Sequence, residues 1–135
     1  MWLHWEQEVV YFLTFCVAGR DTVLANDRTF DALERAIGRL TKWSVGAAIM
    51  MPDHVHLLVT PNDREEPVGN VAAALKRWMR RDLAAMWQWQ PSSFDRLLRS
   101  DESAEEKWHY IWENPMRAGL VERWEDWPYR VGFRL

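Results

Sequence analysis

Two histidines separated by one apolar residue are the first feature of this sequence with the potential for chemistry. His54 and His56 flank Val55 in the segment HVHLLVT, whose β-branched residues are typical of a strand. Because side chains alternate between the faces of a strand, both imidazoles project from one face while Val55 points into the opposite layer. Imidazole is a common ligand of divalent metals, so the pair can share one ion. The same spacing also fits two histidines that are hydrogen-bonded in a core.

A tyrosine and an asparagine four residues apart form a second candidate. Tyr110 and Asn114 lie in a segment that patterns as a helix from Glu102 to about Asn114, which Pro115 ends. A helix presents positions i and i+4 on one face, so phenol and carboxamide would lie side by side. The amide oxygen can complete a metal shell, and the phenol can attack a group that the metal polarises. The alternative for an asparagine before proline is a structural cap at the helix end.

Hydrophobic periodicity predicts the elements that must position these residues. Four segments pattern as strands and three as helices, in the order strand 9–17, helix from Asn26 or Asp27 to 41, strands 43–50 and 54–60, helix 71–86, strand 94–99 and helix 102–114. The tail beyond that last helix is expected to be irregular. This order predicts an α+β fold with the ferredoxin-like (split βαβ) topology, an antiparallel sheet with two helices on one face. The other face is then open to a ligand or to the C-terminal helix.

Length and composition indicate one folded domain over residues 1–135, with a core of about 9–128. Of the 135 residues, 48% are hydrophobic and 27% charged, which excludes disorder as the main state. The longest apolar stretches are far shorter than a membrane span, so no association with a membrane is expected. The lone Cys16 cannot form an internal disulfide, which fits a protein of the reducing cytoplasm.

Charge is segregated along the chain, although the net charge of −3 gives no hint of a nucleic-acid partner. Residues 70–100 contain six basic and two acidic residues, whereas residues 101–126 contain eight acidic and three basic residues. Tryptophans lie in or beside the basic segment, where aromatic rings can stack on bases, although packing is the commoner role for tryptophan.

Three segments match a known family in order and spacing: MPDHVHLLVTP at 51–61, FDRLLRS at 94–100 and YIWENPMRAGLV at 110–121. They resemble the REP-associated tyrosine transposases, which are part of the wider group of HUH single-tyrosine transposases. The resemblance covers roughly residues 9–128. It implies a ferredoxin-like core with His54 and His56 on a central strand and with Tyr110 as the nucleophile on the C-terminal helix. It also implies Asn114 as the third protein ligand of a Mg²⁺ or Mn²⁺ ion.

The same resemblance implies a substrate and a reaction. The substrate is single-stranded DNA beside a hairpin, and attack by Tyr110 yields a 5′-phosphotyrosine and a free 3′-hydroxyl. Because the bond is kept as a phosphodiester, the step is strand transfer rather than hydrolysis. Basic residues are expected to contact DNA phosphates, namely Lys76, Arg77, Arg80 and Arg81 on the second helix and Arg117 beyond the last. Relatives include monomers and homodimers that exchange the C-terminal helix, and either state fits this chain.

Three other classes of protein share some of these features. A domesticated module that binds a DNA hairpin without cutting it is the main alternative. A metal-dependent hydrolase would use the histidines with a carboxylate such as Asp53 or Glu113, but strand alternation places Asp53 on the face opposite His54. An RNA-binding sheet module would share the topology, but the strands lack the aromatic and basic pattern of that class.

Overall fold

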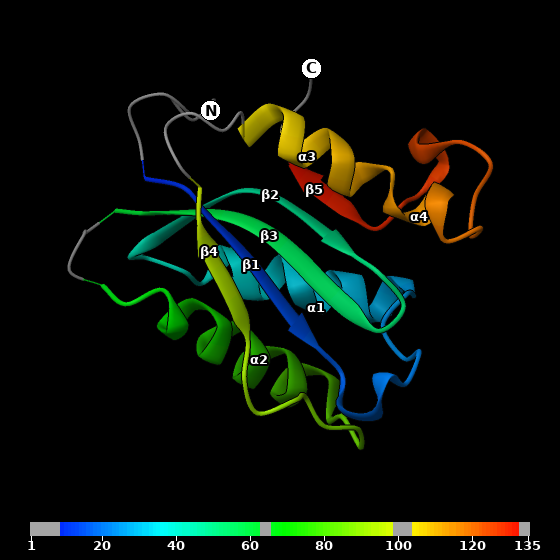
Figure 1. Ribbon diagram of the computed structural model, residues 1–135. Coiled ribbons are helices and arrows are strands. Elements are labelled where there is room, and N and C mark those ends of the chain that lie inside the picture. Colours follow the sequence, from blue (N-terminus) through cyan, green and yellow to red (C-terminus); the bar gives the residue numbers. More distant parts are fainter. Residues whose placement is uncertain (1–8, 63–65, 99–103, 133–135) are drawn as a thin grey trace.

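The predicted succession of strands and helices is present in the computed structural model, which describes residues 9–62, 66–98 and 104–132 (Figure 1). Its elements are β1 (Tyr11–Cys16), α1 (Asp27–Gly38), β2 (Trp43–Met50), β3 (His54–Pro61), α2 (Gly69–Leu83), β4 (Phe94–Leu97), α3 (Ala104–Trp112), α4 (Asn114–Arg117) and β5 (Arg130–Gly132). Short 3₁₀ turns lie at Ala18–Arg20 and Trp124–Asp126. The expected strand end at Arg99 and helix start at Glu102 lie outside the described residues.

The strands form one antiparallel sheet in the order β4-β1-β3-β2-β5. The first four strands have the predicted split βαβ order, so the fold class is confirmed. The prediction of an irregular tail is wrong, because β5 pairs with the outer edge of β2. Three residues are too few to show a periodic pattern, and a contact far along the chain decides their conformation. The Trp127 indole, whose Nε1 donates to the carbonyl of Met50 at 3.0 Å, ties this tail to β2.

Gly132 allows β5 to approach β2 closely. Its φ of +132° is one that side-chain-bearing residues rarely adopt, and a Cβ at this position would lie 2.5 Å from Cα of Ala47. Any other residue at this position would therefore force β5 and β2 to shift apart.

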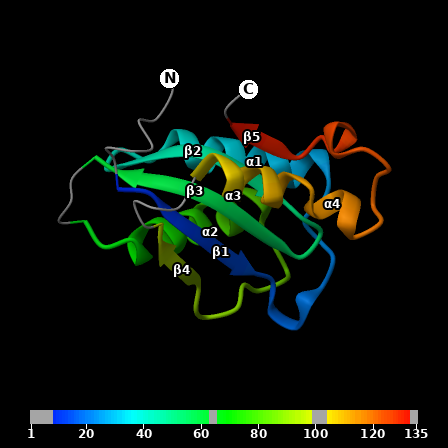
Figure 2. The ribbon, with the colours of Figure 1, turned by 45° about the horizontal axis from the view of Figure 1, so that its top comes forward.

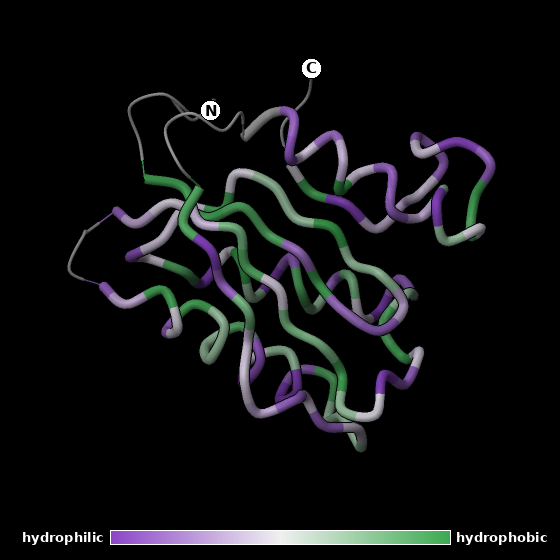
Figure 3. Tube along the Cα trace, in the orientation of Figure 1, coloured by the Kyte–Doolittle hydropathy of each residue, from purple (hydrophilic) through white to green (hydrophobic). Residues whose placement is uncertain are grey.

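Helices cover the two faces of the sheet differently (Figures 1 and 2). On one face α1 and α2 bury a core in which Val55 and Leu57 of β3 pack with Leu75 of α2. On the other face α3 and the tail pack over Leu58 with a separate set of buried residues that includes Trp108, Ile111, Trp112 and Trp127. Figure 3 shows the hydrophobic stretches of the chain gathered in the strands between these layers. Because β3 alternates, its even-numbered residues from 54 to 58 face the α3 layer.

The start of α1 follows its local capping signal, but both helices end earlier than predicted, α1 at Gly38 rather than at 41. Asn26 caps α1, with its Oδ1 accepting a hydrogen bond from the N–H of Thr29 at 2.9 Å. The second helix spans Gly69–Leu83 rather than 71–86, because Ala84 adopts the left-handed conformation that ends helices. Within the described residues, no helix is long and apolar enough to cross a membrane.

Candidate active site

The two histidines lie on one face of β3 with their Nδ1 atoms hydrogen-bonded. Nδ1 of His56 lies 2.7 Å from Oγ1 of Thr14, its partner on β1, and Nδ1 of His54 lies 2.6 Å from Oδ1 of Asp53. The ring centroids are 4.6 Å apart. Such partners on the second nitrogen hold a metal-binding imidazole in position and leave Nε2 for the ligand. The prediction that both rings share one face is confirmed.

The Asp53 side chain lies beside His54, so the prediction that strand alternation places it on the opposite face is wrong. Asp53 lies in the turn that joins β2 to β3, ahead of the first strand residue, so strand alternation does not govern where its side chain points. Its carboxylate contacts His54 on one oxygen and accepts a hydrogen bond from Nε of Arg20 at 2.8 Å on the other. Burial raises the pKa of Asp53, but the hydrogen bonds from Arg20 and His54 outweigh it and leave this pKa below its ordinary value. Asp53 is therefore an ionised carboxylate that orients His54.

His56 is held in its neutral form. Burial, together with the positive charges of His54, Lys107 and Arg20, lowers the pKa of His56 to about 3 against the opposing effect of Asp53. A neutral imidazole is the form that binds a metal ion. The sheet thus keeps His56 in the form that can bind a metal ion at neutral pH.

Tyr110 lies on α3 with 59% of its surface exposed, beside two cations. The guanidinium carbon of Arg117 is 4.0 Å from the centroid of the tyrosine ring, and Nζ of Lys107 is 6.0 Å from it. Lys107 also lies 5.1 Å from the ring of Phe12, which in turn lies 5.1 Å from the ring of His56. A chain of contacts therefore leads from the phenol to the histidine pair.

Asn114 does not continue the helix that carries Tyr110, contrary to the prediction. The helix α3 ends at Trp112 and α4 begins at Asn114, because Pro115 has no N–H to donate and its ring excludes the carbonyl four residues earlier. Nη2 of Arg117 donates to Oδ1 of Asn114 at 2.6 Å and also to the carbonyl of Tyr110. Arg117 thus holds tyrosine and asparagine together across the break. The N-cap residue of α4 is Glu113, and the Oδ1 atom of Asn114 is engaged by Arg117, so Asn114 does not cap α4.

The basic helix α2 lies across the sheet from the histidine pair. Lys76 donates to the carbonyls of Gln90 and Ser92, at 2.9 and 3.1 Å, and Arg80 donates to those of Trp87 and Ala85. These two cations, expected to contact DNA, hold the loop after α2 in place. Arg77 and Arg81 are exposed.

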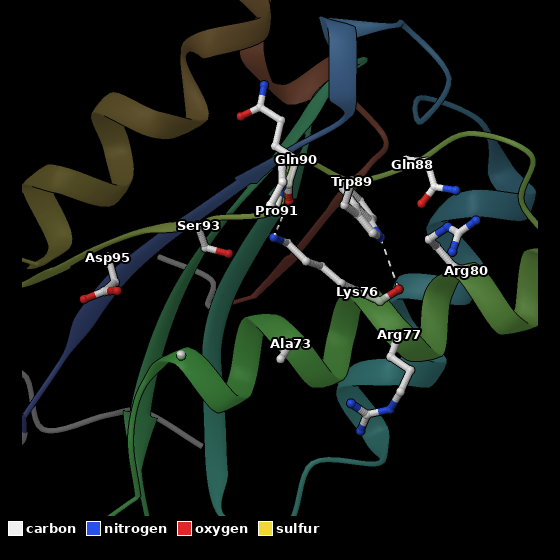
Figure 4. Close-up of a pocket in the computed structure, with 11 residues that line it drawn as sticks. Ala73, Lys76, Arg77, Arg80, Gln88, Trp89, Gln90, Pro91, Ser93 and Asp95 are labelled. Atoms are coloured by element: carbon white, nitrogen blue, oxygen red, sulfur yellow. Dashed lines mark hydrogen bonds between the residues drawn. The ribbon is translucent and has the colours of Figure 1, made fainter.

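A cavity of about 600 Å³ lies between α2 and this loop (Figure 4). Figure 4 shows the Lys76 side chain reaching to Gln90, and the Trp89 indole bonded to the Lys76 carbonyl at 3.1 Å. Trp89 is buried edge-on against Phe15 with centroids 5.0 Å apart, so it is a packing residue.

Comparisons with known proteins give two curated relatives. A Haemophilus influenzae protein whose name assigns it to the REP-associated tyrosine transposases is 29% identical over 97 residues, which is 62% of this chain and 55% of that protein. The REP-associated tyrosine transposase of Escherichia coli K12 is 21% identical over 127 residues, 92% of this chain and 76% of that protein. The chain therefore spans about half the length of the Haemophilus relative. No family model matches the sequence.

Solved structures agree in fold. A REP-associated tyrosine transposase bound to a REP hairpin superposes with a TM-score of 0.74 at 20% identity, covering 91% of this chain and 76% of that one. A Deinococcus radiodurans protein described as a transposase gives a TM-score of 0.58 at 26% identity, covering 79% and 90%. This chain therefore shares its fold with solved transposase structures. The resemblance to the REP-associated tyrosine transposases is confirmed by the two curated relatives and by the similar structure.

Proposed function

We propose that this protein is a DNA strand transferase that cuts single-stranded DNA beside a hairpin through Tyr110 and a divalent metal ion. The observation that carries the proposal is a histidine pair oriented by hydrogen bonds and connected by side-chain contacts to an exposed tyrosine flanked by two cations. The names of the relatives, and the REP hairpin bound in the similar structure, support DNA as the substrate.

The residues present fit a Mg²⁺ or Mn²⁺ ion. His54 and His56 would hold it through their Nε2 atoms, since both Nδ1 atoms are engaged. Asn114 would be the third protein ligand once its Oδ1 exchanges the hydrogen bond from Arg117. When bound, the ion withdraws negative charge from the phosphate oxygens and so makes phosphorus easier to attack.

The chemical step belongs to Tyr110. Its phenolic oxygen forms a bond to phosphorus as the bond from phosphorus to O3′ breaks, the phenolic proton passes to water, and the leaving oxygen takes up a proton as a 3′-hydroxyl. Lys107 and Arg117, which lie against the Tyr110 ring, would stabilise the negative charge that develops on the phenol and the phosphate. The product remains a phosphodiester, so a 3′-hydroxyl can reverse the step and complete strand transfer. A single nucleophile cuts one strand, which suits a single-stranded substrate.

The residues of α2 that we propose to contact DNA phosphates are the two exposed ones, Arg77 and Arg81. Because α2 and the histidine pair lie on opposite faces of the sheet, DNA that contacts both must pass around an edge. The edge strand beside α2 and its loop is β4 (Figure 2).

The covalent intermediate is tested with Tyr110→Phe. We expect the parent protein, with Mg²⁺ or Mn²⁺ and an oligonucleotide carrying a REP-type hairpin, to give a protein–DNA adduct on a denaturing gel. The variant should give no adduct and should bind the oligonucleotide as the parent does, because only the attacking oxygen is removed. Tyr129→Phe is the matched control, since that hydroxyl donates to Asp27 at the start of α1. It should keep the adduct.

An adduct with Tyr110→Phe would mean that another residue is the nucleophile. Hairpin binding by the parent without any adduct would favour the main alternative, a DNA-hairpin-binding module that does not cut.

A further inference from the structure

A row of side chains crosses the sheet from its β4 edge to the histidine pair. Phe94 on β4 is the register partner of Thr14 on β1, and Thr14 is the partner of His56 on β3. Partnered residues project to the same face, as the hydrogen bond between Thr14 and His56 shows for two of them. Neighbouring strands are about 4.8 Å apart, so Phe94 lies about 10 Å from His56 along this row.

Phe94 is much more exposed to solvent than its neighbours on the same face of the sheet. Its exposed fraction is 57%, whereas that of Phe12 is 8%. The two rings meet edge-on with centroids 6.4 Å apart, and Phe12 lies in turn against the His56 ring. Packing therefore fixes one side of Phe94 and leaves the rest of an aromatic ring open to solvent beside the site.

A cation lies on the same aromatic surface. Nζ of Lys107 is 5.1 Å from the centroid of Phe12 and 6.0 Å from that of Tyr110. Phe12 thus separates an exposed ring, Phe94, from a positive charge beside the nucleophile. A nucleotide of single-stranded DNA offers the complement of this pair, a flat base for the ring and a phosphate for the cation. Duplex DNA does not, because its base faces are covered by stacking.

We propose that Phe94 is a stacking platform for an unpaired base that flanks the phosphate attacked by Tyr110. The proposal deepens the function proposed above and rests on it in naming that phosphate, but base stacking does not itself require cleavage. It also gives the β4 edge a role, because a strand passing around this edge meets Phe94 before it reaches Lys107.

Stacking is tested first without cleavage. The probe is a REP-type hairpin oligonucleotide with a single-stranded tail that carries 2-aminopurine at one tail position at a time, bound in EDTA. We expect the parent to quench the fluorescence at one or two adjacent positions, Phe94→Leu to lose this quenching and Phe94→Trp to keep it. Leu97→Ala is the matched control, since Leu97 is 49% exposed on the same strand but alternates to the other face, and it should quench like the parent.

Cleavage then tests whether the stacked base flanks the reacting phosphate. The phosphate cut by the parent is mapped from the adduct, and an abasic site is placed at the quenched position. We expect the abasic site to slow adduct formation by the parent about 5- to 150-fold, the range that base–aromatic stacking provides. It should have no further effect on Phe94→Leu, because the partner ring is already missing.

The proposal would be overturned if Phe94→Leu quenched the fluorescence as the parent does. It would also be overturned if the abasic site slowed adduct formation by Phe94→Leu as much as by the parent, so that the two effects on the rate multiplied. A parent that forms no adduct but shows Phe94-dependent quenching would overturn the cleavage function and the flanking position while leaving the stacking role. The two failures are thus distinguishable.

Discussion

Lowering the pH should destabilise this protein through His56. The pKa of His56 is lowered from 6.5 to about 3, first by burial and then by the nearby positive charges. Between these values the unfolded chain binds a proton at this residue and the folded chain does not, so the free energy of unfolding falls as the pH falls. The stabilisation is complete above pH 6.5 and is lost progressively as the pH drops toward 3.

The magnitude follows from the proton difference. One proton corresponds to about 1.4 kcal/mol per pH unit, and integration from pH 7 to pH 5 gives a loss of about 2 kcal/mol. That loss is measurable against the total of about 5 to 15 kcal/mol for a domain. Asp53 does not interfere, because its pKa is lowered from 3.8 and it titrates below this window.

The assay is urea denaturation of the metal-free protein in EDTA at pH 7, 6 and 5. We expect His56→Gln, whose amide can still bond to Thr14, to lack the decrease of about 2 kcal/mol that the parent shows. His109→Gln, outside the pair, is the control and should follow the parent. Equal pH dependence in the parent and in His56→Gln would refute the reasoning, because it would mean that folded His56 accepts a proton in this range.

Three further predictions concern the metal ligands and the tail. His54→Ala should abolish metal-dependent cleavage even though Tyr110 is intact, and EDTA should stop cleavage by the parent. Adduct formation by the parent that persists in EDTA would exclude a role for a metal ion. Asn114→Ala should slow cleavage about 10- to 100-fold with rescue by raised Mn²⁺, whereas unchanged metal dependence with a lower melting temperature would assign Asn114 a purely structural role. Gly132→Ala should reduce the free energy of unfolding by about 1 to 3 kcal/mol, since a Cβ would lie 2.5 Å from Cα of Ala47; parental stability in urea would show that β5 contributes little.

Local patterns were sufficient for the main elements. The alternation in HVHLLVT correctly places His54 and His56 on one face, and hydrophobic spacing correctly predicts the succession of strands and helices up to α3. The same approach misplaces Asp53, since alternation applies only within a strand and Asp53 lies in the turn before it. Hydrophobic spacing also predicts one helix over 102–114. In the structure this segment is divided between α3 and α4, because Pro115 interrupts the helix.

The sequence by itself determined the fold class and the residue types of the site, because periodicity and side-chain alternation act over a few neighbouring residues. Only the tertiary structure decided which groups complete that site. Thr14 reaches His56 across 42 residues, Arg20 reaches Asp53 across 33, and these contacts set the orientation of the histidines and the charge of the carboxylate. Whether a basic residue is free for DNA is decided in the same way, since Lys76 is held by loop carbonyls that no local pattern places beside it.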